Sequence, residues 1–589
     1  MVVKKLRPKY QRDDQNLVFD EDQRSFLNSS HTEKQIVLAG PGAGKTTVAI
    51  QRVVDLDAAV STNQDASYPF AVLFLSFSRA SIQAAAESMS TDLASLKVEF
   101  QAQTIDSLAY EICRYDGQMS LAEIEQTDFD DRLEIAANLS DQEGTNLTYD
   151  LRHVFVDEAQ DISVNQANFL KRYISNLPEE CGVTIFADPD QEIYRFLDFD
   201  SEQTPRWDYF HQQLKDLFTW EYFTFNGRYR AQSIFMRQIL DSLAQVRSEP
   251  NRARKTALLD KIQTRLPTIT LERLADTTES RAAKSAVLAR TNASVTFCFD
   301  YLRRAGYSNL SPVFPTDWQG LYPSWIGEVA CSIPANEFSS HDLKIALEAT
   351  AHTGFEPDPV THLNLKLRRQ MTWEEIRRFY ETSDFRRSAH DRGRLTLSTI
   401  HQSKGLEFDD VAILDPGELL LRSPVELEVL FVALSRARNM TYSVVPPDDY
   451  VNFRTHGRRL LKYRYVGKRR ILTHISILPG DISLPAHLGA ARAERPIRIE
   501  RDAFLSFKPI LSRTCFSYYC TVNGDVVGET TEEFGRLLRS EARTEAPPNL
   551  GSVPMAGLST QFVPGPGGVR PILVPIPFGI SEVKQSQRT

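Results

Sequence analysis

Cysteine is scarce in this chain, with six among 589 residues. They stand at positions 113, 181, 298, 331, 515 and 520, and no two of them form a Cys-x-x-Cys pair. The sequence therefore indicates neither a zinc site nor a disulfide framework. We predict reduced thiols that are mostly buried.

Long hydrophobic runs are missing as well. No apolar run approaches the roughly 18 residues that a membrane-spanning helix needs. The start of the chain, MVVKKLRPKYQRDDQ, is basic but no apolar segment follows it, so it is not typical of a secretory signal. We expect a cytoplasmic protein with no membrane partner.

An excess of positive charge is also lacking, because the net charge is −9. Contact with nucleic acid would therefore depend on a local groove rather than on a basic field over the whole molecule. A hydrophobic content of 42% and a charged content of 25% are ordinary for a globular protein. A chain of 589 residues is too long for one core and predicts several domains.

The stretch QIVLAGPGAGKTT, residues 35–47, is the most informative in the chain. A short apolar strand leads into a glycine-rich loop, and Gly-Lys-Thr opens a helix, which is the pattern of a phosphate-binding loop. Backbone N–H groups and the positive helix end would hold phosphate oxygens. Lys45 would reach the β and γ phosphates, and the Thr46 hydroxyl would bind Mg²⁺. The predicted nucleotide-binding residues of the loop are Gly40, Gly42, Ala43, Gly44, Lys45, Thr46 and Thr47.

Two further strand-like runs end in polar residues. Val154-Phe155-Val156 leads into Asp157 and Glu158, and 182–186 leads into 187–191, ADPDQ. An acid at a strand end can bind Mg²⁺ and its neighbour can activate water. Strands that alternate with helices predict parallel sheets with ligands at the carboxyl ends of the strands. Gln23, a dozen residues before the loop, could pair with an adenine edge, although a surface role is commoner for a lone glutamine.

Eight stretches in order resemble the motifs of the UvrD/Rep-like superfamily 1A helicases, over roughly residues 15 to 450. They are AGPGAGKT at 39–46, FLSFSRA at 74–80, DEAQD at 157–161, DPDQEIYRF at 188–196, FNGRYR at 225–230, AVLARTN at 286–292, TIHQSKGLEF at 399–408 and LFVALSRAR at 430–438. The resemblance implies an α/β fold with two RecA-like P-loop domains. Each would hold a parallel sheet and an inserted, mostly helical subdomain, and a small C-terminal β-containing module would follow.

The implied domains are 1–221, with a 1B insertion at about 79–150, and 222–475, with a reduced 2B insertion at about 293–394. The C-terminal module is 476–589. The cofactors are ATP and Mg²⁺. Lys45 would hold phosphate, Thr46 and Asp157 would hold Mg²⁺, and Glu158 would be the general base.

The resemblance also assigns residues that the local pattern alone does not. Gln191 would sense the γ-phosphate, and Arg230 and Arg436 would act as arginine fingers, since guanidinium groups stabilise the charge of the transferring phosphoryl group. Gln23 and Tyr229 would hold the adenine and Glu407 the ribose. Phe77, Tyr194, Phe196 and His401 match positions that contact DNA, although aromatic residues at strand ends more often pack in the core.

Four residues depart from the family pattern: Asp106 for histidine, Arg228 for asparagine, Ala187 for glycine and Leu197 for arginine. They affect the expected grip on DNA more than the expected ATPase activity. Two basic stretches, about 364–394 and 458–470, could bind either nucleic acid or a partner protein. For the first stretch, a solvated helix face with no partner is an equally good interpretation. In the first, Trp373, Ile376, Phe379 and Tyr380 at helical spacing predict a packed face.

The tail after about residue 471 does not extend the resemblance. It shows strand-like stretches at 504–512 and 515–522, a hairpin turn at 523–525 and a helix at 532–540. Pro547 to Pro577 is rich in proline and glycine and predicts an extended or partly disordered segment. The spaced carboxylates and lysine of a RecB-type nuclease domain are not found, so cutting of DNA is not predicted.

The sequence thus predicts an ATP-dependent translocase on single-stranded DNA or a single-strand/double-strand junction, and a 3′→5′ helicase. The alternative is a DNA-stimulated regulatory ATPase that unwinds little. It would switch a partner nuclease through the 2B insertion or the C-terminal module, as in the Gabija-type antiphage systems whose layout this chain resembles. A small-molecule P-loop kinase is disfavoured by the motifs of the second half.

Overall fold

The computed structural model describes residues 19–61, 70–77, 82, 98–116, 119–140, 150–194, 205–313, 322–349, 370–382, 393–416, 426–495, 497–510, 515–565 and 567–585. The chain divides into two compact units. Unit 1 comprises Met1–Leu266, Ser403–Val411 and Pro416–Thr441. Unit 2 comprises Pro267–Gln402, Ala412–Asp415 and Tyr442–Thr589.

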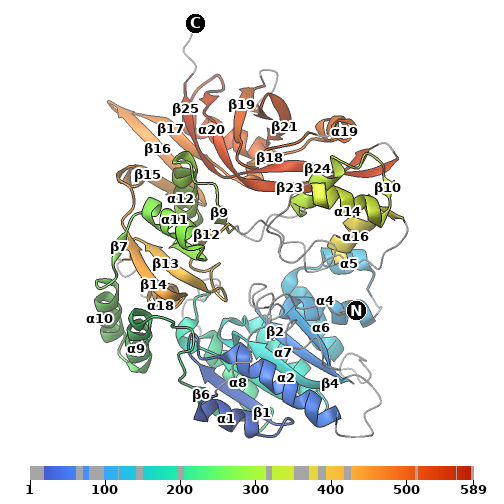
Figure 1. The fold of residues 1–589 in the computed structure, drawn as a ribbon, viewed down its shortest axis with the longest axis vertical. Coiled ribbons are helices and arrows are strands. Elements are labelled where there is room, and N and C mark those ends of the chain that lie inside the picture. The colour runs from blue at the N-terminus through green and yellow to red at the C-terminus, as the bar shows by residue number, and fades with distance from the viewer. Residues whose placement is uncertain are drawn as a thin grey trace. The chain divides into compact units, whose positions relative to one another are not determined.

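Unit 1 is built on a six-stranded sheet with the strand order β3-β2-β4-β5-β1-β6, in which every neighbouring pair is parallel (Figure 1). Its strands are β1 (Lys34–Ala39), β2 (Ala71–Ser76), β3 (Glu99–Thr104), β4 (Leu151–Asp157), β5 (Gly182–Ala187) and β6 (Glu221–Phe225). Its helices are α1 (Glu21–Asn28), α2 (Lys45–Ser61), α4 (Ile105–Asp116), α5 (Leu121–Gln126), α6 (Phe129–Ser140), α7 (Val164–Ser175), α8 (Arg206–Lys215), α9 (Ile234–Ser248), α10 (Arg252–Gln263) and α18 (Glu426–Leu434).

Both faces of this sheet are covered, which explains why its central strands are apolar runs without polar alternation. Along β4, Val154 and Val156 pack with α4, α6, α7 and α8 in one core cluster. Phe155 between them packs with α1 and α2 in another. Because the strands are parallel, their carboxyl ends meet at one edge of the sheet, and the loops at that edge carry the predicted site.

A histidine is among the buried polar side chains of this sheet. The His153 ring is fully buried, with Nε2 2.9 Å from Thr184 Oγ1 and Nδ1 3.3 Å from the His31 carbonyl oxygen. Burial, reinforced by the nearby charge of Arg52, lowers the pKa of His153 to about 3. The His153 ring is therefore neutral in the folded protein at pH values well above 3.

Acid should destabilise the protein through His153. The unfolded chain binds a proton on this ring below about pH 6.5, whereas the folded chain does not until about pH 3, so stability falls as pH drops through this window. Between pH 7 and pH 5, we expect the free energy of unfolding to fall by about 1–2 kcal/mol less in His153→Gln than in the wild type. Urea unfolding at the two pH values measures this. Thr184→Val, which removes the hydrogen-bond partner but no titrating group, should keep the wild-type slope, and an unchanged slope in His153→Gln would contradict the assignment.

A second six-stranded sheet has the strand order β7-β14-β13-β8-β12-β9. In it β12 pairs in parallel with β8 and β9, and β14 pairs in parallel with β7. The unit boundaries fall inside β13 and β14. The strands are β7 (Thr268–Ile269), β8 (Ser285–Ala289), β9 (Leu310–Pro312), β12 (Leu395–Thr399), β13 (Phe408–Leu414) and β14 (Ala437–Val444), and α11 (Leu271–Arg281) and α12 (Asn292–Arg304) accompany them.

The predicted 2B region holds α13 (Ser324–Ala330), α14 (Ser340–Ala349), α16 (Trp373–Thr382) and the small antiparallel pair β10 (Glu337–Phe338) and β11 (Met371–Thr372). Trp373 and Ile376 are buried in one cluster with the helix α13, which confirms the predicted packed face for these two residues. The side chains of Phe379 and Tyr380 lie outside the described part of the chain. Most of the basic stretch around them lies outside the described residues.

The C-terminal part of unit 2 is formed by two antiparallel sheets, with the orders β15-β16-β17-β25-β22 and β18-β21-β20-β19-β23-β24. The strands are β15 (Phe453–His456), β16 (Arg459–Val466), β17 (Arg469–Ile477), β18 (Ile482–Ser483), β19 (Phe504–Pro509), β20 (Tyr518–Val522), β21 (Asp525–Thr530), β22 (Asn549–Leu550), β23 (Val553–Gly565), β24 (Gly568–Pro577) and β25 (Gly579–Lys584), and the helices are α19 (Ala486–Glu494) and α20 (Glu532–Ala542). The predicted hairpin turn and helix are confirmed, since Asn523 and Gly524 have positive φ between β20 and β21 and α20 follows.

The prediction of an extended or partly disordered segment from Pro547 to Pro577 is wrong. The strands β23 and β24 form a long antiparallel hairpin, and α13 packs against it (Figure 1). The prolines are tolerated because β24 is an edge strand, where one row of backbone N–H groups needs no partner. Pro571 and Pro575 stand four residues apart, on the same side of that strand.

The absences noted in the sequence have structural counterparts. All six cysteines are free thiols, and four of them are buried. Among the helices that the structure describes, none is long and apolar enough to cross a membrane. The α/β fold class is confirmed, with one fully parallel sheet, a second sheet that contains parallel pairs, and additional antiparallel sheets towards the C-terminus.

Candidate active site

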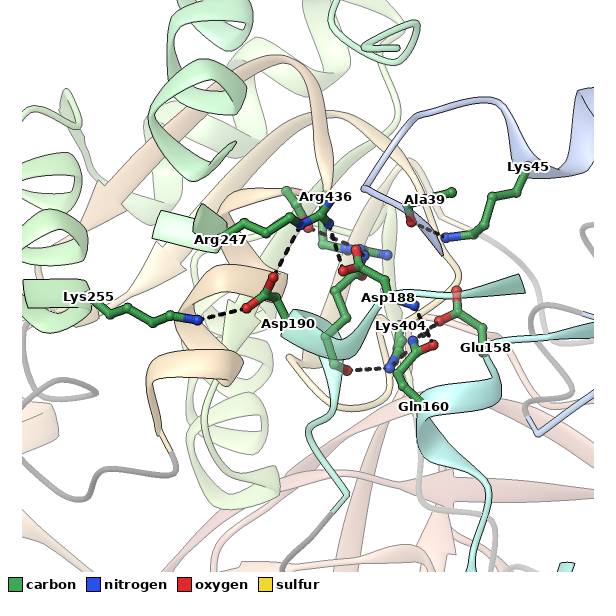
Figure 2. A network of polar contacts seen from close by, with 12 residues as sticks. Ala39, Lys45, Glu158, Gln160, Asp188, Asp190, Arg247, Lys255, Lys404 and Arg436 are labelled. Atoms are coloured by element: carbon green, nitrogen blue, oxygen red, sulfur yellow. Dashed lines mark hydrogen bonds and ion pairs between the residues drawn. The ribbon is translucent and has the colours of Figure 1, made fainter. Parts of the chain in front are cut away.

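The phosphate-binding loop connects β1 to α2, as predicted. Gly42 and Gly44 have φ of 69° and 81°, which a residue with a Cβ atom rarely adopts, and the helix begins at Lys45. The Lys45 ammonium group donates to the Ala39 carbonyl oxygen at 3.2 Å, across the loop (Figure 2). Thr46 and Thr47 lie in the first turn of α2, where the positive end of the helix dipole favours an anion.

Glycine is also needed in the loop because three side chains approach it closely. A Cβ atom at Gly40 would lie 2.7 Å from Nη1 of Arg247, and one at Gly42 would lie 2.4 Å from Cβ of Arg230. A Cβ atom at Gly44 would lie 2.8 Å from Nε2 of Gln23. All three contacts lie within unit 1, so the loop is bounded by two arginines and a glutamine.

The acid pair stands at the carboxyl end of β4. Glu158 has a left-handed backbone with φ of 54°, and its Oε2 accepts a hydrogen bond from Gln160 Nε2 at 2.5 Å. Burial favours the neutral form of Glu158, but the charges of Lys45, Lys404 and Arg436 outweigh burial and lower its pKa to about 2. Glu158 is therefore ionised within the protein interior, which is the state in which a carboxylate can accept a proton.

Asp157 has a different electrostatic environment from its neighbour. Burial and the adjacent charge of Glu158 raise the pKa of Asp157 to about 6. Its Oδ1 is buried and has no hydrogen-bond partner among the described residues. A buried carboxylate oxygen without a partner is costly unless a cation binds it, so Asp157 fits a magnesium ligand.

The other expected Mg²⁺ ligand also fits. Thr46 opens the helix one residue after Lys45 and is partly exposed. No group of three or more His, Cys, Asp or Glu that could hold a metal lies within the described part of the chain.

Lys404 lies in the middle of this site, although the sequence analysis gave it no role. Its ammonium group forms an ion pair with the Asp161 carboxylate, donates to the Gln191 carbonyl oxygen at 2.5 Å and lies 3.7 Å from Glu158 Oε2. Its side chain is 2% exposed. Burial raises the pKa of Asp161 to about 7 in spite of this contact. The available signal was its position inside the stretch TIHQSKGLEF, of which only the histidine and the glutamate were assigned.

Gln191 and Arg436 contact each other directly. Arg436 Nη2 donates to Gln191 Oε1 at 2.7 Å, and Arg436 Nε donates to the Val432 carbonyl oxygen at 3.1 Å. Burial, followed by repulsion from Arg230, lowers the pKa of Arg436 to about 10. The guanidinium group is still charged at neutral pH, and it lies in the same buried cluster as Glu158.

Arg230 and Glu407 contact each other, which the sequence did not predict. Arg230 donates to Glu407 Oε1 from Nε at 2.9 Å and from Nη2 at 2.7 Å, and Arg438 lies 3.0 Å from Glu407 Oε2. Burial opposes ionisation of Glu407, but the two arginines outweigh it and lower its pKa to about 2. The predicted ribose ligand and the predicted arginine finger therefore form an ion pair beside Gly42.

The predicted adenine residues lie on the other side of the loop. Gln23 Nε2 donates to the Ala43 carbonyl oxygen at 3.0 Å, and its Oε1 accepts from the Asp20 backbone at 3.2 Å. Tyr229 is half-exposed, and its hydroxyl donates to Asp20 Oδ2 at 2.7 Å. Burial and this hydrogen bond raise the pKa of Tyr229 to about 12. Gln23 thus links the loop to the capped start of α1, and about half of the Tyr229 side chain is exposed.

Two of the four predicted DNA-contacting residues are neighbours. The Phe77 and Tyr194 ring centroids are 5.0 Å apart, and the Lys404 ammonium lies 5.9 Å from the centre of the Tyr194 ring. His401 belongs to unit 2. Phe196 lies outside the described residues, as does Leu197.

The sequence analysis missed a second group of charged residues beside the cluster. Arg247 on α9 and Lys255 on α10 both contact Asp190, and Arg247 also contacts Asp188 (Figure 2). Asp188 and Asp190 follow the strand β5 directly and were noted as polar residues at a strand end. No local pattern marks Arg247 and Lys255, because each shares its helix with at least one other basic residue.

Comparisons with known proteins agree with this geometry. Residues 23–197 match the AAA domain family, and residues 394–442 match the UvrD-like helicase C-terminal domain. No curated protein matches the chain.

Solved structures are more distantly similar. The Pif1 helicase from Candida albicans has 12% identity and a TM-score of 0.36, with 75% of this chain and 98% of that chain covered. The Pif1 helicase from Bacteroides in complex with ADP-AlF3 and ssDNA has 12% identity and a TM-score of 0.35, with 74% and 96% covered. In these two stretches, residues 23–197 and 394–442, the chain is thus similar to an AAA domain and to the C-terminal domain of UvrD-like helicases.

Proposed function

We propose that this chain is an ATP-dependent translocase on single-stranded DNA and a 3′→5′ helicase of the superfamily 1A type. One observation carries the ATPase part. The phosphate-binding loop, the ionised base Glu158 and the pair of Gln191 and Arg436 lie together in unit 1, although they come from stretches far apart in the sequence. The direction of movement rests on the family resemblance.

The residues of the loop and the acid pair would bind the nucleotide. Lys45 would exchange the Ala39 carbonyl oxygen for β- and γ-phosphate oxygens, and the loop N–H groups would hold the remaining oxygens. Thr46 and Asp157 would hold Mg²⁺, which when bound neutralises phosphate charge. Glu158 would accept a proton from the attacking water, since its carboxylate is ionised and Gln160 orients it.

Two arginines would stabilise the charge that develops on the transferring phosphoryl group. Arg436 is already aimed at the cluster by Gln191. Arg230 lies against Gly42 and is held by Glu407, so nucleotide would compete with Glu407 for its guanidinium group. Binding of the ribose by Glu407 and of phosphate by Arg230 would then replace one ion pair by two contacts with the nucleotide.

Single-stranded DNA would stack on Phe77 and Tyr194. Base–aromatic stacking contributes about 1–3 kcal/mol per base and tolerates any sequence. Both rings are only partly buried, and Lys404 connects Tyr194 with Glu158 through contacts of 5.9 Å and 3.7 Å. A base on Tyr194 would therefore alter the surroundings of the general base, which supports hydrolysis that responds to DNA.

Steady-state ATP hydrolysis by the purified chain, with and without single-stranded DNA, tests the proposal. We expect stimulation by DNA of about tenfold or more and loss of activity in Lys45→Ala, since that change removes the phosphate contact. An oligonucleotide duplex with a 3′ tail should then be unwound in preference to one with a 5′ tail. Hydrolysis that is absent, or that survives in Lys45→Ala, would overturn the proposal.

A specific observation favours a second candidate, a regulatory ATPase that switches a partner nuclease. The described residues beyond 442 lie outside both matched domains, and they fold into two antiparallel sheets with their own core. An ordered additional module of this kind suits a docking role. Hydrolysis that DNA stimulates but that separates no strands would favour this candidate over the first.

A further inference from the structure

Arg247 is an arginine near the C-terminal end of α9 that no motif includes. Its Nη2 donates to Asp188 Oδ1 at 2.6 Å and its Nε donates to Asp190 Oδ2 at 3.2 Å. Lys255 holds the other oxygen of Asp190 at 2.9 Å. The Asp188 side chain is 1% exposed, whereas that of Arg247 is 31% exposed, so Arg247 brings the charge that balances a buried carboxylate.

Asp188 connects Arg247 to the catalytic cluster. Its second oxygen, Oδ2, accepts a hydrogen bond from Gln191 Nε2, while Gln191 Oε1 accepts from Arg436 Nη2. The chain of contacts therefore runs from Arg247 through Asp188 and Gln191 to Arg436.

These contacts determine the orientation of the Gln191 side-chain amide. A carboxylate can only accept a hydrogen bond and a guanidinium group can only donate, so Asp188 selects the NH₂ end and Arg436 selects the oxygen. If Asp188 lost its cation, its buried charge would be poorly balanced and its carboxylate would be free to rotate. The Gln191 amide would then lose one of the two partners that determine its orientation.

The backbone of Asp188 is tied to the general base as well. Its N–H donates to Gln160 Oε1 at 2.9 Å, and Gln160 Nε2 donates to Glu158 Oε2 at 2.5 Å. The guanidinium group of Arg247 also lies against the phosphate-binding loop, since a Cβ atom at Gly40 would lie 2.7 Å from its Nη1. Arg247 thus contacts both the phosphate-binding loop and Asp188. Asp188 in turn is linked to Gln191 by its side chain and to Glu158, through Gln160, by its backbone.

We propose that Arg247 is a positioning residue for ATP hydrolysis, which acts through Asp188 to hold Gln191 in the orientation that Arg436 requires. This inference rests on the proposed function, because it assigns a role in the same ATPase site. Arg247 would set the rate of the chemical step and leave the binding of the nucleotide to the loop.

The test compares kcat and nucleotide affinity for Arg247→Met, Arg247→Lys and Asp188→Asn. We expect kcat to fall by about 10- to 100-fold in Arg247→Met and Asp188→Asn, a loss typical of a misplaced catalytic group. The Kd for ATP should stay within about threefold of the wild type. Arg247→Lys should recover part of the loss, since it keeps the charge but not the fork of donors. Arg237→Met, an exposed arginine of the same helix, is the matched control and should behave as the wild type.

A double-mutant cycle separates positioning from a merely structural ion pair. If Arg247 acts through Gln191, Arg247→Met should cost less than about twofold in a Gln191→Ala background, where no amide is left to orient. An equal loss in both backgrounds, or a loss confined to ATP affinity, would overturn the inference. Thermal unfolding of each variant identifies one that fails to fold, and Asp188→Asn breaks the same link with a smaller change in volume.

The inference and the proposed function fail in different ways. A wild-type chain that hydrolyses no ATP refutes the proposed function. A wild-type chain that is active, together with an Arg247→Met variant that matches Arg237→Met, refutes the role of Arg247 alone.

Discussion

Glu158→Gln is expected to lower the rate of ATP hydrolysis by about 10³-fold, within the range that a general base contributes. The change removes the carboxylate that would accept the proton of the attacking water and conserves the volume of the side chain. The physical basis is the charge of the site, since Lys45, Lys404 and Arg436 hold the pKa of Glu158 near 2 and a neutral amide cannot replace that base. Single-turnover hydrolysis measures the loss, and fluorescent-nucleotide titration measures binding.

Nucleotide binding should survive in the same variant, because Lys45 and the loop are unchanged. Removal of one negative charge beside Asp157 should also lower the pKa of that carboxylate, which favours its ionised form. Glu180→Gln is the control for loss of a surface carboxylate, since Glu180 is 76% exposed and pairs only with Arg152 among the described contacts. Turnover within tenfold of the wild type in Glu158→Gln would contradict the assignment of the base.

Arg436→Ala is expected to lower kcat by at least about 10²-fold while most of the affinity for ATP is kept, because arginine fingers are worth 10³-fold or more in related phosphoryl transfers. The variant removes the donor that holds Gln191 Oε1 and a positive charge near Glu158. Arg436→Lys keeps a charge but offers a single donor group in place of the fork that contacts Gln191 and Val432. We expect Arg436→Lys to be impaired nearly as much.

Because Arg436 is buried, a fold check accompanies these assays. Thermal unfolding should show that Arg436→Lys is folded, and DNA-free ATP binding should be measurable in it. Arg254→Ala, an exposed arginine on α10, controls for the loss of a surface arginine. Normal hydrolysis by a folded Arg436 variant would show that the cluster of Gln191 and Arg436 is not the catalytic centre.

Some parts of the site could be predicted from local sequence with little ambiguity. Gly42 and Gly44 adopt the positive φ that the loop pattern requires. Asp157 ends a strand whose apolar residues predict that the strand is buried. Gln191 and Arg436 were assigned only through the family resemblance, and the structure places them in contact. The positions of these two residues in the sequence do not by themselves predict how far apart they lie in the folded protein.

Other parts could not be predicted. From the local sequence, Pro571 and Pro575 are expected to interrupt a strand. They nevertheless lie within β24, because β24 is an edge strand and one of its sides is unpaired. Gln23 reads as an isolated glutamine, and only folding brings its amide against the Ala43 carbonyl oxygen. Lys404 and Arg247 are ordinary cations in the sequence, and each gains its role from carboxylates that other strands present.

The sequence by itself determined the phosphate-binding loop, the acid pair and the strands that carry them. These features depend on backbone freedom and on side chains that are neighbours in the chain, so a short stretch contains all the information. The tertiary structure alone decided the partners across the site. Lys404 and Gln191 are 213 residues apart, Arg436 and Gln191 are 245 apart, and Arg247 and Asp188 are 59 apart. Hydrogen bonds over such separations follow from the strand order and from helix packing, because only these decide which loops meet at the carboxyl edge of the sheet.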